Sequence, residues 1–238
     1  MLHRLIRLGV AAVAVAGFLT LSPRASADTI TLLMETNGTG VYIYPYGGLA
    51  VLEGSGPFQW SQTAPLVPGF PTTVLTYCID IEQFIKLGQA HTFTIQPHLA
   101  LAPTIGTEAK AAAITELYDR YYLTGLTNTA NQNAFQLALW ELVYDGPDSR
   151  NLSAGRIQVT NAQAQAMLNS LGTPYSTHDL AGSKLLALVS DTKQDQLVVI
   201  PGPGKPVPAP PAVVLAGVGV LALLGRARWN RRKATPAA

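Results

Sequence analysis

Two residues could take part in a chemical reaction: a single cysteine, and a glutamine that lies among apolar residues. Cys78 is the chain's one cysteine and lies in the string YCID, and Gln136 follows 58 residues later in the string FQLALW. A buried carboxamide costs about 1–3 kcal/mol unless its polar atoms find partners. On the residues alone, the simplest interpretation is that Gln136 hydrogen-bonds a buried backbone group and that Cys78 packs as a small hydrophobic side chain.

Two carboxylates offer a weaker possibility of acid–base chemistry. Asp80 and Glu82 alternate just after a predicted strand, so both side chains could share one face. The sequence contains no HExxH, GxSxG or phosphate-binding glycine loop, and His91, His98 and His178 do not cluster. We therefore predict a protein that is not an enzyme and that has no metal site and no cofactor. A polysaccharide-acting enzyme is kept as an alternative.

The elements that position these residues change in type along the chain. Strands rich in β-branched and aromatic residues are predicted at residues 29–34, 40–44, 72–77 and 91–95, and a last strand at 196–200. Helical periodicity predicts helices at residues 108–123, 131–144, 161–171 and 179–190. The expected fold is α+β: an N-terminal antiparallel β sandwich or barrel, then a helical portion, then a strand. Glu141 and Asp145, one helical turn apart, are expected to be solvated.

Both ends of the chain carry targeting signals. Residues 1–27 have basic, apolar and small-residue regions in the order of a signal peptide, with cleavage predicted after Ala27. Residues 201–211 form a proline-rich spacer, and residues 212–233 an apolar membrane helix with a basic tail. Arginines beyond the helix stay on the cytoplasmic side, so the domain at residues 28–200 is expected to face outward.

Composition narrows the choice of partners. All 14 acidic residues lie within residues 28–200, where basic residues are few, and no basic stripe indicates nucleic-acid binding. A single cysteine excludes an internal disulfide framework, so the stability of this exported domain must come from burial.

The two strings YCID and FQLALW resemble the cysteine and glutamine motifs of bacterial surface thioester domains. The resemblance implies that Cys78 and Gln136 join with loss of ammonia into a buried thioester, which then reacts with a nucleophile on a partner surface. Under this interpretation Phe135 and Trp140 would shield the activated acyl group from water. Gram-positive members have threonine before the glutamine, where this chain has Phe135.

The C-terminal spacer, helix and arginine cluster resemble the PEP-CTERM sorting signal, which is processed by an exosortase. Pro208, Ala209 and Pro210 stand where that family has Pro-Glu-Pro. The resemblance implies a protein that is membrane-anchored and then delivered to the cell surface or extracellular matrix. The predicted function is covalent attachment to a surface, exopolysaccharide or protein partner, and the first alternative is a non-reactive envelope or matrix protein.

Overall fold

The computed structural model describes residues 29–36, 39–45, 51–173, 175 and 180–202. The predicted signal peptide with Ala27, the sorting motif Pro208–Ala209–Pro210 and the predicted anchor at residues 212–233 lie outside these ranges. Within the described ranges, no helix combines the length and the apolar character needed to cross a bilayer.

Six strands close into an antiparallel barrel in the order β1-β4-β5-β9-β8-β6. Its strands are β1 (Thr29–Thr36), β4 (Phe58–Gln62), β5 (Thr73–Cys78), β6 (Ala90–Gln96), β8 (Lys184–Val189) and β9 (Gln196–Ile200). The last strand lies between β5 and β8, so the two ends of the described sequence meet in one sheet. The prediction of an α+β fold containing a barrel is confirmed.

The barrel interior is aromatic, with one polar chain running through it. The fully buried Trp60 ring packs edge-on against Phe93, with ring centroids 5.7 Å apart. Its indole N–H donates to the Thr76 hydroxyl over 2.8 Å, and that hydroxyl donates to Gln196 Oε1 over 2.9 Å. Each buried polar group is thereby paired, which removes the cost of burying it.

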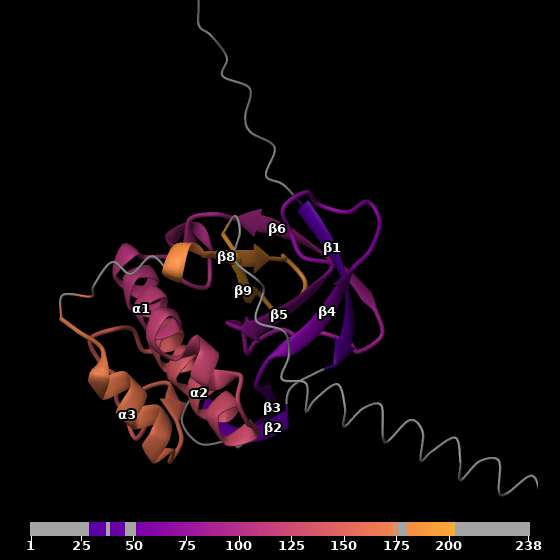
Figure 1. Cartoon of the computed structure of the whole chain (residues 1–238). Helices are drawn as coiled ribbons and strands as arrows, with labels where there is room; N and C mark the ends of the chain where they lie inside the picture. The colour runs from indigo at the N-terminus through magenta and orange to yellow at the C-terminus, as the bar shows by residue number, and fades with distance from the viewer. Residues whose placement is uncertain (1–28, 37–38, 46–50, 174, 176–179, 203–238) are drawn as a thin grey trace, which may run out of the picture.

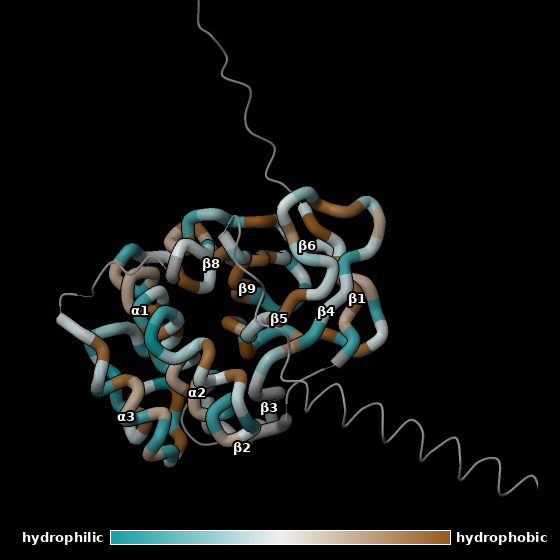
Figure 2. The backbone as a smooth tube through the Cα atoms, in the orientation of Figure 1, coloured by the Kyte–Doolittle hydropathy of each residue, from teal (hydrophilic) through white to brown (hydrophobic). Residues whose placement is uncertain are grey.

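Three helices lie together beside the barrel (Figure 1). They are α1 (Glu108–Gly125), α2 (Thr129–Tyr144) and α3 (Ala162–Ser170), and two 3₁₀ turns occur at η1 (Leu99–Leu101) and η2 (Leu180–Gly182). Side-chain oxygens of Thr107, Asn128 and Asn161 accept the backbone N–H three residues on and so define the N-terminal ends. Figure 2 shows hydrophobic segments of β5 and β9 between the helices and the far wall of the barrel.

Helix α2 is the centre of this arrangement. Every residue from Ala134 to Val143 is buried, and α2 packs against both α1 and α3. A helix that is apolar on all sides belongs inside a protein. The prediction that Glu141 is solvated is therefore wrong, because its carboxyl group lies in this buried stretch.

A second, small sheet has the order β3-β2-β7. It consists of β2 (Thr39–Pro45), β3 (Val51–Ser55) and β7 (Ile157–Gln158), with β2 antiparallel to both neighbours. Asp145 accepts hydrogen bonds from the backbone N–H groups of Arg156 and Ile157 at the start of β7. Asp145 therefore anchors this edge, whereas the sequence had predicted a solvated side chain.

One predicted helix is wrong. Residues 179–190 contain only the short turn η2 and then strand β8. The Leu185–Leu188 run is buried throughout and pairs with both β6 and β9. A continuous apolar run is typical of a strand buried on both faces, and over so short a length it cannot be told from a helix by periodicity. Strands β3, β4 and β7 were not predicted.

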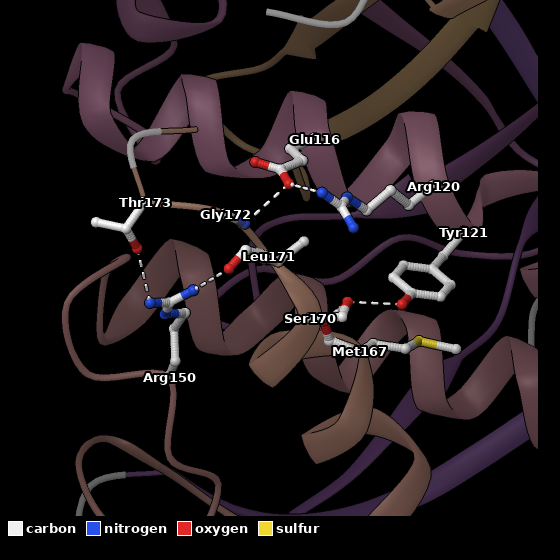
Figure 3. A network of polar contacts seen from close by, with 9 residues as sticks. All are labelled: Glu116, Arg120, Tyr121, Arg150, Met167, Ser170, Leu171, Gly172 and Thr173. Carbon is white, nitrogen blue, oxygen red and sulfur yellow. Dashed lines mark hydrogen bonds and ion pairs between the residues drawn. The ribbon is translucent and has the colours of Figure 1, made fainter. Parts of the chain in front are cut away.

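A polar network fastens the end of α3 to α1 (Figure 3). Glu116, fully buried on α1, accepts from Gly172 N–H over 2.9 Å and pairs with Arg120 at 2.6 Å. The Tyr121 and Ser170 hydroxyls lie 2.6 Å apart. These contacts tie the segment after α3 to the helix that packs on α2.

Candidate functional site

Cys78 is the last residue of β5 and is fully buried. Strand β4 reaches only as far as the position opposite Thr76, while β9 continues to pair opposite Cys78. The register between β4 and β5 therefore ends two residues before Cys78. Buried main-chain donors and acceptors must be hydrogen-bonded.

Gln136, on α2, hydrogen-bonds the main chain of Cys78. Its Oε1 accepts from Cys78 N–H over 3.2 Å, and its Nε2 donates to Cys78 C=O over 2.7 Å. Both residues are fully buried, so the carboxamide lies flat against the backbone of the cysteine in the protein interior. The structure thus brings together the two residues that the sequence singled out, and the expectation that Gln136 hydrogen-bonds a buried backbone group is met.

The Cys78 sulfur lies against the turn that follows β5. Its thiol donates to the Asp80 carbonyl over 3.0 Å, and the Asp80 N–H approaches the sulfur at 3.3 Å. The sulfur therefore both donates to and accepts from the backbone of Asp80. The acyl oxygen of Gln136 and the sulfur of Cys78 therefore each have a backbone N–H donor.

Tyr77 and Phe135 directly precede Cys78 and Gln136 in the sequence, and their rings pack together in the core. Phe135 packs on Tyr77 and Tyr118, with ring centroids 4.6 and 5.0 Å away. The Tyr77 hydroxyl donates to Gly125 C=O over 3.0 Å. Trp140 is fully buried four residues after Gln136, which puts both on one face of α2. Phe135 and Trp140 are placed where water is excluded.

A hollow of about 440 Å³ lies on the other side of the Asp80 turn. Four carboxylates line it: Asp80, Glu82, Asp191 and Asp195. We call it the acidic hollow. Its lining also includes Tyr144, whose hydroxyl accepts from Ile81 N–H over 2.9 Å and lies within hydrogen-bonding reach of the Asp80 side chain. Asp80 therefore contacts the cysteine sulfur through its backbone and borders the acidic hollow as well.

Burial changes the acidity of two of these carboxylates. Asp80 and Asp195 are each about nine-tenths or more buried, and this desolvation raises the pKa of both. Hydrogen bonds from Glu82 N–H to Asp80 and from Ser190 N–H to Asp195, 2.8 and 2.9 Å long, oppose the rise. Both groups are consequently better proton acceptors than ordinary carboxylates once ionised.

The two cationic side chains that line the acidic hollow each have a partner within the protein. Arg156 pairs with Glu82, and Lys110 donates to the Val143 carbonyl near the end of α2 over 2.6 Å. Asp80 and Glu82 do border one hollow, as their alternation suggested, but Glu82 faces Arg156. Among the residues that the structure describes, no cluster of three or more His, Cys, Asp or Glu side chains could bind a metal ion.

Sequence reasoning missed Tyr144, Thr104 and Asp195. Tyr144 could have been found, because it lies eight residues after Gln136 and so on nearly the same helical face. The contact between the Thr104 hydroxyl and Asp195 spans 91 residues and has no local signal.

The chain was also compared with known proteins. It matches no protein-family model, and no curated protein and no solved structure is significantly similar to it. The function is therefore argued from the geometry around Cys78 and Gln136.

Proposed function

We propose that this chain is an exported surface domain in which Cys78 and Gln136 form an internal thioester for covalent attachment to a partner. The observation that carries the proposal is the double hydrogen bond that holds the Gln136 carboxamide against Cys78 in the interior. A fixed, desolvated pair of this kind converts a slow bimolecular reaction into an intramolecular one.

The chemistry balances with the two side chains alone. The Cys78 sulfur attacks the carboxamide carbon of Gln136, the carbon–nitrogen bond breaks, and the thiol proton leaves with the nitrogen as ammonia. The Cys78 N–H, which already binds Oε1, stabilises the oxyanion of the tetrahedral intermediate. A primary amine of a partner then attacks the same carbon, the carbon–sulfur bond breaks, and an amide bond and the Cys78 thiol result.

The attachment function requires delivery to the surface. We place the folded domain at residues 28–200, between a cleaved signal peptide and a proline-rich spacer, and the strands and helices described within this stretch support that part of the proposal. The sorting-signal resemblance of the tail adds an exosortase as processing partner, with anchoring by the helix at residues 212–233. Surface or matrix polymers are then the available attachment partners.

One observation favours a second candidate, a non-reactive envelope or matrix protein. Unmodified Gln136 already hydrogen-bonds both main-chain groups of Cys78, so the arrangement is also a stable structural device. The two candidates differ in whether a covalent bond joins Cys78 to Gln136.

A measurement of the intact protein mass distinguishes the thioester candidate from the non-reactive candidate. The full chain, exported and purified in detergent, is weighed as wild type and as Cys78→Ala, Gln136→Ala and the matched control Gln163→Ala, which changes an exposed glutamine of α3. We expect wild type and Gln163→Ala to be lighter than calculated by one ammonia and to gain one methylamine on treatment. The Cys78 and Gln136 variants should do neither. A wild-type mass equal to the calculated one, with a titratable thiol, would leave the structural candidate.

A further inference from the structure

The acidic hollow has no role in forming the thioester, yet its lining residue Asp80 is two residues after Cys78 and contacts the reacting sulfur. Cys78 and Gln136 are fully buried, so an external nucleophile needs a route to them. Asp80 borders the hollow and contacts the sulfur through both its backbone N–H and C=O. Among the described cavities, this is the one whose lining residue contacts the reacting atoms.

The charge of the hollow indicates what it would admit. Four lining carboxylates face two lining cations, and those cations are occupied, Arg156 by Glu82 and Lys110 by a helix carbonyl. A cleft with an excess of one charge raises the local concentration of the opposite charge.

A second hollow of about 450 Å³ shares part of its lining with the first. The two share Pro103, Val189, Ser190 and Asp191, and the second extends along the outer side of β6 past the hydroxyl-bearing Thr92 and Thr94. Two hollows with a shared lining, one of them bordered by a residue that contacts the sulfur, suit a nucleophile carried on an extended chain.

We infer that the acidic hollow is the route by which the partner's amine reaches the thioester, that it favours an amine carried on a positively charged chain, and that Asp80 accepts the proton of the entering ammonium. This inference rests on the proposed function. The protons balance as follows: the ammonium gives one proton to the Asp80 carboxylate, and the neutral amine attacks the acyl carbon. The nitrogen then gives a second proton to the departing Cys78 thiolate, and Asp80 returns its proton to solvent through the hollow. The raised pKa of Asp80 suits it to this exchange.

The test compares two amines on the full chain in detergent. Cadaverine carries a second positive charge, and 6-aminohexanoate carries a negative charge at a similar distance from its amine. The ratio of their adduct rates, followed by intact mass, measures charge selection. Asp191→Asn removes one exposed charge from the rim shared by both hollows, and Asp148→Asn removes one exposed charge away from them.

We expect the wild-type ratio to favour cadaverine and to fall about sevenfold in Asp191→Asn. The distal charges of the two amines differ by two units, and each unit is worth about threefold for charges roughly 7 Å apart in water. Asp148→Asn should leave the ratio unchanged, and Asp80→Asn should slow both amines while the ammonia-loss mass persists. A ratio that Asp191→Asn and Asp148→Asn alter equally, or an unchanged rate in Asp80→Asn, would overturn the inference alone. A wild-type chain without the ammonia-loss mass would instead overturn the proposed function, and the inference with it.

Discussion

Glu141 gives the chain a dependence of stability on pH that can be worked out from its surroundings. The side chain is fully buried on α2, where Oε1 accepts from Asn151 N–H over 2.7 Å. Burial, together with the negative charge of Asp145, raises the pKa of Glu141 from 4.5 to about 7. Folding therefore favours the protonated form, and the free energy of unfolding decreases as pH rises from 4.5 through 7.

The substitution Glu141→Gln removes this dependence while keeping the acceptor for Asn151. A pKa rise from 4.5 to about 7 corresponds to roughly 3–4 kcal/mol of unfolding free energy. We expect the variant to exceed wild type by about this amount near pH ~8, and to equal it below the unfolded-state pKa of 4.5.

Urea unfolding at a series of pH values measures the difference. Glu108→Gln, which changes an exposed glutamate in the first turn of α1, serves as the control and should show no comparable pH-dependent gain. A difference between Glu141→Gln and wild type that stays constant from acid to alkaline pH would refute the reasoning. So would a wild type that is the more stable protein at alkaline pH.

Two further substitutions test the fold. Thr76→Val keeps the shape of the side chain but leaves the Trp60 N–H and Gln196 Oε1 without their shared partner, so we expect a loss of about 2–4 kcal/mol in chemical denaturation. A loss below about 0.5 kcal/mol would mean that the buried polar chain adds little to stability. Gly155→Ala puts a Cβ against the Asp145 carboxylate at a positive φ of 92°, and we expect a loss of about 1–3 kcal/mol and a lower Tm by calorimetry. An unchanged Tm would show that the turn before β7 can relax.

Local sequence signals were sufficient to predict the class of fold and to single out Cys78 and Gln136. β-branched runs located β1, β2, β5, β6 and β9, and the misplaced polarity of Gln136 in FQLALW indicated a buried hydrogen-bonding partner. The motif resemblance suggested Cys78 as the partner of Gln136. No local sequence pattern could show that two residues 58 positions apart are in contact.

The errors arose where tertiary pairing decided the outcome. Strand β8 has the leucine and alanine composition of a helix, and its pairing with β6 and β9 overrides that preference. Glu141 was predicted to be solvated because the sequence does not show that α2 is buried on all sides. Asp195 reaches the acidic hollow because the barrel closes through β9, which the spacing of residues could not reveal.

The way the barrel closes also sets when the candidate site can exist. Strand β5, which carries Cys78, is completed on one side by β9, and their buried side-chain link joins Thr76 to Gln196 across 120 residues. Contacts so distant in sequence form only after the intervening chain is available. Under the proposed function, a chain that is still crossing a membrane keeps Cys78 and Gln136 apart. The proposed thioester would then form only after export, away from the nucleophiles of the compartment in which the chain is synthesised.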